Sequence, residues 1–425
     1  MKAAQVPKYL QQPKAFEPKP SFLGGVMPSH LDRNAKMFLS GAVINGVSNG
    51  VFNSVLQLYL ASFGFDGQGL GTIIMMNALT ATVLTIPCGI LADRIGKRKM
   101  IFTGFTAVSL AMISFFLAQS IEGFALSFAF IGVSNAAATV FTPLYSSFFK
   151  KDDMDKAFGL YGLINISAMS LGSLVGYVPP IMVDAFGISL KTAYRYTMVS
   201  AGALFVLQYV FIYLSSLGIK EQLSRELRFN LKSKWLVLKI CGIGLLGNIA
   251  GGIMFSLFPY YVNQKYGVAS AGLGTLFFIS NLAMALSKGT AASFAKRLGG
   301  MKSITFGIAF SAVFLLLMPL SPSFGVLAVF YVLRMGTRFM SDPLITSMFM
   351  RSISEDEKST ANSLRMISMN GGGVVSPILG GAMMERVGLD TPAFIGGALT
   401  LLVAALYPLL LRREAEVLLE NGGQH

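Results

Sequence analysis

Four primary amides recur at every fourth position of one apolar stretch between Ala42 and Phe63. They are Asn45, Asn49, Asn53 and Gln57. Four residues are close to one helical turn, so these side chains form a column along one face of a helix. A primary amide both donates and accepts hydrogen bonds, and it can either join neighbouring helices or bind a polar ligand. The regular spacing favours a ligand, and we predict that the column lines a water-filled cavity and binds substrate.

Charged side chains inside later apolar segments form a second group that could bind a ligand. Arg334, Arg338 and Asp342 share one helical face at four-residue spacing, and Lys288 and Arg365 lie in neighbouring segments. A charge in the middle of a bilayer costs about 2.5–3.5 kcal/mol, so these side chains should face the protein interior. The fork of an arginine suits carboxylate and phosphate groups, so we predict that Arg334 and Arg338 bind substrate. We assign coupling or gating roles to Asp342, Arg365 and Lys288.

The sequence leaves two arrangements of these charges open. In the first, one cavity has a neutral amide wall from the first half of the chain and a cationic wall from Arg334 and Arg338. In the second, Arg338, Asp342 and Arg365 form a neutralising network at a gate, because intramembrane charges often pair with one another. Asp342 is the one acid that we place deep inside a predicted span, so it is also the candidate carrier of a coupling proton.

The composition indicates a membrane protein. The chain of 425 residues is 53% hydrophobic and only 13% charged, with a mean hydropathy of +0.63, whereas globular proteins carry about 25% charged residues. The formal net charge of +14 could suit nucleic acid, but its location in loops beside apolar spans indicates a bilayer instead. The histidines His30 and His425 lie in the tails, and Cys88 and Cys241 are isolated. We therefore expect no metal site, no cofactor, no disulfide and no enzyme active site.

Twelve apolar segments of about the length needed to span a bilayer follow one another. They are 35–63, 68–92, 100–119, 121–149, 157–184, 192–216, 235–264, 271–295, 303–319, 323–350, 360–387 and 391–411. Basic clusters such as DRIGKRK and KKDDMDK fall in connections on the side of the two tails, and few basic residues lie on the opposite side. The positive-inside rule therefore predicts a multi-pass protein of the cytoplasmic membrane with both termini in the cytoplasm.

The spans form two related halves. GLGTIIMMNALTA at position 69 is matched by GLGTLFFISNLAM at position 272, and one long polar connection separates the halves. We predict an all-α integral membrane fold with two pseudo-symmetric six-helix bundles, a pattern typical of transporters whose site lies between the halves. The expected parts are a tail (1–34), a bundle (35–217), a linker (218–234), a second bundle (235–412) and a second tail (413–425).

The stretch GILADRIGKRK at 89–99 resembles the signature of the loop between the second and third helices of the major facilitator superfamily. The resemblance extends to the twelve spans and the central connection, and it implies that this loop is a latch that holds the halves in one access state. The latch residues are Gly89, Asp93, Arg94, Gly96, Lys97 and Arg98. By their own chemistry, Gly89 should permit close helix approach and Gly96 a tight turn. The superfamily's proton-antiporter signature places an arginine where Phe128 stands, which weighs against drug–proton antiport.

Together these features predict a secondary transporter that moves a small organic anion or zwitterion by alternating access. We expect a lipid bilayer and a coupling proton or sodium ion as partners, no nucleic acid, and function as a monomer. Export of amphipathic or hydrophobic compounds is the alternative, because the 23 Met and 34 Phe residues would suit a permissive pocket. A non-transporting membrane sensor on the same fold is a further alternative.

Overall fold

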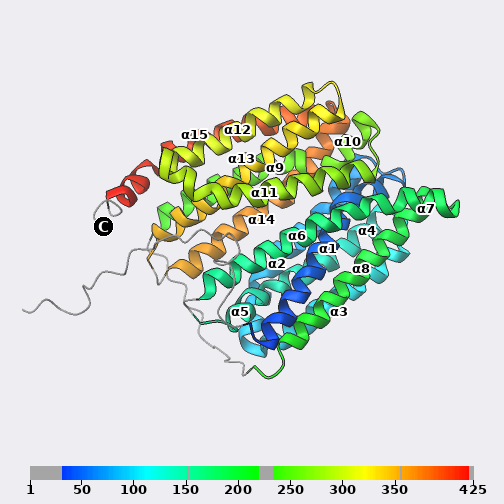
Figure 1. Ribbon diagram of the computed structural model, residues 1–425, viewed down its shortest axis with the longest axis horizontal. Coiled ribbons are helices and arrows are strands. Elements are labelled where there is room, and N and C mark those ends of the chain that lie inside the picture. Colours follow the sequence, from blue (N-terminus) through cyan, green and yellow to red (C-terminus); the bar gives the residue numbers. More distant parts are fainter. Residues whose placement is uncertain (1–30, 151–152, 220–232, 355–356, 421–425) are drawn as a thin grey trace, which may run out of the picture.

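The computed structural model describes residues 31–150, 153–219, 233–354 and 357–420, and those residues form helices without a strand. The first half contains α1 (Arg33–Ala61), α2 (Gly67–Ile95), α3 (Lys97–Leu117), α4 (Ile121–Ala137), η2 (Ala138–Val140), α5 (Phe141–Ser146), α6 (Met154–Ser173), η4 (Leu174–Tyr177), α7 (Val178–Phe186) and α8 (Leu190–Ser215). The second half contains α9 (Lys234–Phe255), α10 (Phe258–Tyr266), α11 (Ser270–Leu298), α12 (Gly300–Leu317), η5 (Met318–Leu320), α13 (Phe324–Arg351), α14 (Lys358–Arg386) and α15 (Thr391–Glu420). Figure 1 shows the halves as two separate bundles.

Prolines explain why several spans contain more than one helix. A proline clashes with the carbonyl four residues earlier, so the α-helical ladder is interrupted there. The 3₁₀ turn η2 precedes Pro143, η4 precedes Pro179, and the break between α9 and α10 precedes Pro259. When α4–α5, α6–α7 and α9–α10 are each joined in this way, the chain forms twelve spans at the predicted places.

Ten of these spans are long and apolar enough to cross a membrane by length and composition, within the part of the chain that the structure describes. The two remaining long helices are α1 and α14. Both carry the polar side chains that the sequence singled out, the amide column on α1 and Arg365 on α14. A spanning helix with many polar groups needs a protein or water environment on one face, so these two helices belong inside the molecule.

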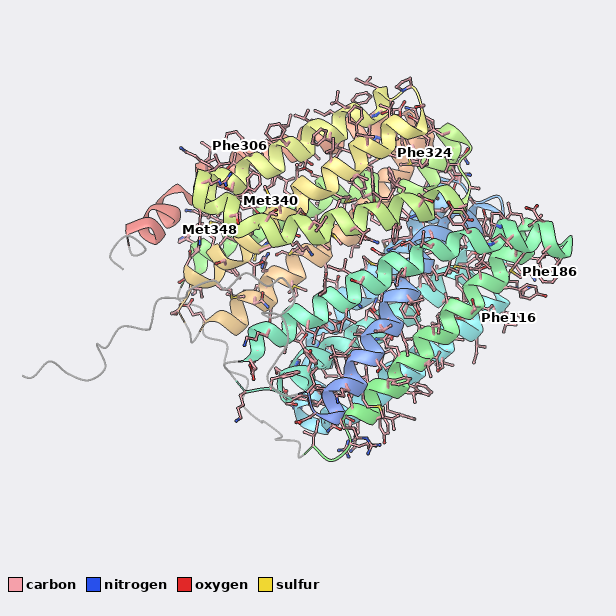
Figure 2. All side chains as sticks on the ribbon, in the orientation of Figure 1. Phe116, Phe186, Phe306, Phe324, Met340 and Met348 are labelled. Carbon is pink, nitrogen blue, oxygen red and sulfur yellow. The ribbon has the colours of Figure 1, made fainter. Side chains whose placement is uncertain are left out.

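Large apolar side chains cover the outer faces of both bundles. Phe116, Phe186 and Phe306 point away from the bundles (Figure 2), and they are 46%, 73% and 51% exposed. An exposed apolar surface of this extent is unfavourable in water, and it marks a face that contacts a partner protein or a membrane. The exposed apolar faces and the twelve spans confirm the predicted integral membrane fold.

The two bundles meet at one end of the molecule. We call the end at which α1 begins and α15 ends the tail end, and the opposite end the far end. The bundles diverge toward the tail end (Figure 1). At the far end, Ser270 Oγ donates to Gly176 O at 2.7 Å, and Gly67 N donates to Glu385 Oε1 at 2.7 Å. These hydrogen bonds seal the far end between α2, η4, α11 and α14.

The loop between α2 and α3 tests two of the backbone predictions. Gly96 has φ = +97°, a conformation that favours glycine, and Gly299 has φ = +87° at the matching turn of the second half. This confirms the tight turn and the internal symmetry. The predicted close approach at Gly89 is wrong, because a Cβ atom placed there would have no neighbour within 4 Å. Close approach occurs instead at Gly71, which packs on the carbonyl of Pro377.

The predicted boundaries fall near the observed helix ends. α1 begins at Arg33 and α9 at Lys234, while α15 continues to Glu420, beyond position 412 where the second bundle was expected to end. Most of the first tail (1–30), the centre of the linker (220–232) and residues 421–425 lie outside the described residues.

Candidate functional site

A cavity of about 710 Å³ lies between the two bundles, with walls from both halves. Its polar walls contain eight amide side chains, Asn45, Asn49, Asn53, Gln57, Asn77, Asn135, Gln208 and Asn281. Its aromatic walls contain Phe52, Phe128, Phe141, Tyr161, Phe205, Tyr209, Phe255, Phe258, Phe277 and Tyr331. We call this space the central cavity. No Asp, Glu, Lys, Arg or His of the described residues lines it, so its surface is polar but uncharged.

The predicted amide column lies along the central cavity, as its periodicity indicated. Its members have different partners. Asn45 Nδ2 donates to Gln208 Oε1 at 2.8 Å, and Asn165 Nδ2 donates to Asn45 Oδ1 at 3.1 Å. Asn49 Nδ2 donates to the carbonyl of Asn45 at 2.9 Å. The tail-side part of the column therefore joins α1 to α6 and α8 while it also faces the cavity.

Gln57 is the member of the amide column nearest the far end of the molecule, and it connects the two halves. Its Nε2 donates to the carbonyl of Ser256 at 2.8 Å, and its Oε1 accepts from Tyr260 N at 3.1 Å. These partners lie at the break between α9 and α10, where the helix leaves backbone groups unpaired. Gln57 therefore closes the cavity toward the far end.

Asn53 is the member with the weakest protein contact. It is exposed, and its Nδ2 lies 3.9 Å from the sulfur of Met169. Thioether sulfur is only a weak acceptor. This amide therefore retains most of its hydrogen-bonding capacity for water or a ligand in the cavity.

The sequence analysis missed four of the amides in the cavity wall, namely Asn77, Asn135, Gln208 and Asn281. Asn135 Nδ2 donates to Asn77 Oδ1 at 2.9 Å, which links α4 to α2 beside the cavity. Each of these residues is a single amide within an apolar segment, so no periodic pattern marks it. The one sequence feature that could have indicated them is their polarity, because a polar residue in a membrane span usually faces the protein interior.

Aromatic rings form a continuous apolar surface on the second-half side of the cavity. The rings of Phe258 and Tyr331 are stacked with centroids 4.4 Å apart, and Phe255 lies 5.5 Å from Phe258. In the first half, Phe52 and Phe205 meet edge to face at 5.1 Å. Aromatic side chains give large contact area with geometric tolerance, so this wall suits an apolar ligand surface.

The arginines of α13 lie elsewhere. Arg334, Arg338, Asp342 and Arg365 line a second pocket of about 40 Å³ inside the second half, between α9, α12, α13, α14 and α15. We call it the arginine pocket. None of its lining residues also lines the central cavity. The prediction of one cavity with an amide wall and a cationic wall is therefore wrong for this conformation, because α13 turns Tyr331 and Met335 toward the cavity and its arginines away from it.

Within the arginine pocket, Asp342 pairs with Arg338 through an ion pair of 2.5 Å. Arg365 Nη2 instead donates to Thr346 Oγ1 at 3.3 Å. The described residues show no ion pair between Asp342 and Arg365, so the expected neutralising pair between α13 and α14 is absent, and the hydrogen bond from Arg365 to Thr346 joins these two helices instead. Lys288 lies outside both pockets, with its Nζ 5.2 Å from the ring centroid of Phe339.

The predicted latch residues gather at the tail end of the first half. Lys97 Nζ donates to the carbonyl of Pro143 at 3.3 Å, and Arg98 Nη2 donates to that of Ser216 at 2.9 Å. Both bonds stay within the first half, where they fasten the start of α3. Asp93 and Arg94 are exposed, and Asp93 forms no ion pair with a described residue. This open arrangement agrees with the separation of the bundles at the tail end.

Comparison with known proteins places this architecture in a family. The model of the Major Facilitator Superfamily matches residues 38–245 and again 240–424. An MFS-type transporter of Methanocaldococcus jannaschii is 24% identical over 355 residues, which cover 80% of this chain and 88% of the relative. Multidrug resistance protein MdtG of Escherichia fergusonii is 23% identical over 404 residues, which cover 91% of this chain and 97% of that protein.

A solved structure supports the same assignment of the fold. The crystal structure of a mutant of the nucleoside transporter NupG superposes with a TM-score of 0.71 at 14% identity, covering 89% of this chain and 99% of that one. At this identity the likeness concerns the fold alone. The family match over both halves, the duplicated bundles and the cavity between them agree, and the chain belongs to the major facilitator superfamily of membrane transporters.

Proposed function

We propose that this protein transports amphipathic organic compounds that combine an apolar body with polar, uncharged groups. The observation that carries the proposal is the composition of the central cavity, whose wall offers eight amides and ten aromatic rings but, among the described residues, no Asp, Glu, Lys, Arg or His. Its volume of about 710 Å³ falls within the range of about 300–1,000 Å³ that is typical of sites for drug-sized ligands.

The aromatic wall and the amide wall would bind different parts of the ligand. The aromatic surface would remove apolar area of the ligand from water, which is favourable and tolerant of shape. The amides would compensate the polar groups of the ligand, because each can turn a donor or an acceptor toward it. A neutral site of this kind selects weakly among related compounds, since a missing neutral hydrogen bond costs only about 0.5–1.5 kcal/mol.

Similarity to proteins named multidrug resistance protein MdtG supports this substrate class. At 23–25% identity the relatives do not define the substrate of this chain. The hypothesis of a small organic anion required Arg334 and Arg338 in the cavity wall, and they line the arginine pocket instead. The cavity therefore favours export of amphipathic compounds, which the sequence analysis held as the alternative.

The direction of opening supports a transport cycle. The distribution of basic residues assigns the tail end to the cytoplasm, so the structure would correspond to a state that is closed outside and open inside. The central cavity extends from Gln57 near the sealed far end to Thr142 and Tyr161 on the tail side. Alternating access would break the far-end contacts and bring the latch loop with Asp93 against the second half.

Flux in proteoliposomes tests the proposal. We expect saturable uptake of an uncharged amphipathic dye into vesicles that contain the purified protein, and inhibition by other amphipathic compounds but not by small carboxylates. Saturable uptake of an organic anion, with no competition from amphipathic compounds, would contradict this proposal and support transport of a small organic anion. Binding without flux would indicate a sensor on the same fold.

A further inference from the structure

Arg334 is a buried cation whose side chain has no hydrogen-bond partner among the described residues. The residue is only 4% exposed, and its Nε is buried without an acceptor. Within the same part of the chain its side chain takes part in no ion pair, and its Cζ lies 3.7 Å from the ring centroid of Phe255. A guanidinium stays charged in proteins, so Arg334 cannot avoid the cost of its burial by losing a proton and becoming neutral. A buried N–H group without a protein acceptor usually donates to a bound water or ion.

The neighbouring charges favour an anion over water. Three guanidinium groups and a single carboxylate line the arginine pocket. The carboxylate of Asp342 is already engaged by Arg338, which leaves Arg334 and Arg365 without a counter-charge in the pocket. The unbalanced charge of Arg334 is costly, because this side chain is buried inside a helical bundle, where the low dielectric weakens its solvation.

The pocket also offers neutral donors in suitable places. Tyr407 from α15 and Asn248 from α9 line it together with the arginines. One N–H of the Asn248 amide already donates to the carbonyl of Gly244 at 3.0 Å, which leaves its second N–H, and the hydroxyl of Tyr407 is a further donor in the lining. With Arg334 on α13 and Arg365 on α14, the donors of the lining come from four helices, and their hydrogen bonds to an anion would be stronger than neutral ones.

The size of the pocket limits the class of anion. A volume of about 40 Å³ has room for about three water-sized spheres. A monatomic ion fits such a space, whereas a drug-sized organic compound does not. The transported compound of the central cavity is therefore excluded from this site.

We propose that the arginine pocket is a binding site for a small inorganic anion, of which chloride is the prototype. The ion lies inside the second-half bundle, against Arg334 and within reach of Arg365 and Tyr407. It supplies the missing counter-charge and joins helices α9, α13, α14 and α15. This site is distinct from the central cavity, and the inference does not depend on which compound the protein transports.

Thermal unfolding of the purified full-length protein in detergent tests the site. We expect the midpoint to rise saturably when potassium chloride or bromide replaces potassium gluconate at constant ionic strength. Arg334→Gln should weaken the apparent halide affinity by about tenfold or more, because one charge-assisted hydrogen bond is lost. Lys302→Gln is the matched control, since it removes an exposed cation from α12 of the same half and should leave the halide response unchanged.

Anomalous diffraction from crystals grown in bromide gives a second measurement that needs no variant. A bromide peak beside Arg334 supports the proposal even if Arg334→Gln does not fold. The proposal is overturned if the wild type shows no saturable difference between halide and gluconate, which would mean that water alone fills the pocket. It is also overturned if Arg334→Gln responds like the wild type, or if bromide binds only at the protein surface.

Discussion

At the scale of single residues, the amides of α1 divide into side chains bound within the protein and side chains free for a ligand. Asn45 is held between Gln208 and Asn165, whereas Asn53 has only the sulfur of Met169 at 3.9 Å. An amide with strong protein partners contributes to helix packing. An amide that faces the cavity without them contributes to ligand recognition, so the two positions should respond differently to the same substitution.

We expect Asn53→Ala to weaken ligand binding without changing stability. The loss of a neutral hydrogen bond is about 0.5–1.5 kcal/mol, or about a two- to twelvefold rise in Kd. Asn45→Ala is the matched comparison on the same helix face, and it should lower the unfolding midpoint because it breaks bonds worth about 0.6–2 kcal/mol each. Ligand titration and thermal unfolding of both variants check this. Equal loss of stability in both variants would show that the whole column is structural.

Asp342 stays the candidate proton carrier. Its ion pair with Arg338 lines the arginine pocket, and protonation would break that pair. We expect Asp342→Asn to abolish any dependence of transport on a pH gradient while substrate still binds in the central cavity. Uptake driven by an imposed pH gradient, compared with uptake driven by sodium, is the measurement. Undiminished proton-driven uptake in the variant would exclude this residue as the carrier.

At the scale of elements, the seam between α2 and α14 determines whether the far end is closed. Gly71 packs on the carbonyl of Pro377, and Gly381 packs on the carbonyl of Gly67. Glu385 at the end of α14 accepts from Gly67 N at 2.7 Å and from the hydroxyl of Tyr260 at 2.9 Å. A carboxylate at a helix N-terminus also meets the positive end of the helix dipole, so Glu385 fastens the start of α2 to the second half.

We expect Glu385→Gln to shift the protein toward the state that is open at the far end. Because Glu385 is exposed, the effect should be only about 0.5–1 kcal/mol, or about a two- to fivefold change in the population ratio. Distances between spin labels on α7 and at the start of α15 report the opening, after Cys88 and Cys241 are replaced by alanine. Glu122→Gln, an acid at the start of α4, is the control. Unchanged distances in Glu385→Gln would show that the contacts of Glu385 do not hold the far end closed.

At the scale of the whole molecule, two gates at opposite ends must open in turn. The far end is closed by hydrogen bonds between the halves, while Asp93 at the tail end forms no ion pair with a described residue. A residue that is unpaired in one state can stabilise only the other state. The latch loop should therefore act in the conformation that is closed at the tail end.

We expect Asp93→Asn to lower turnover while membrane insertion and substrate binding stay close to wild type. Loss of the latch would raise the population of the tail-open state, which spin labels on α5 and at the start of α14 would report. Lys99→Gln, which removes an exposed charge just after the latch residues, separates the specific role of the carboxylate from the general charge of this region. Normal turnover of Asp93→Asn at matched protein level would contradict a latch.

Features that depend on local order could be predicted from the amino-acid sequence. Hydropathy predicted the twelve spans, the repeat predicted two related bundles, and the spacing of Asn45, Asn49 and Asn53 placed them on one helix face. Periodicity could do this because a helix keeps its 3.6-residue turn whatever surrounds it.

The contacts of each helix face, in contrast, became visible only in the folded protein. Arg334 and Arg338 share a face, as predicted, but the rotation of α13 directs them into the second half and directs Tyr331 into the cavity. Gly71 rather than Gly89 lies where two helices touch. Single amides such as Asn135 join the site because neighbouring helices bring them there. The rotation and contacts of a helix are set by packing against its neighbours, and a pattern within one helix does not contain them.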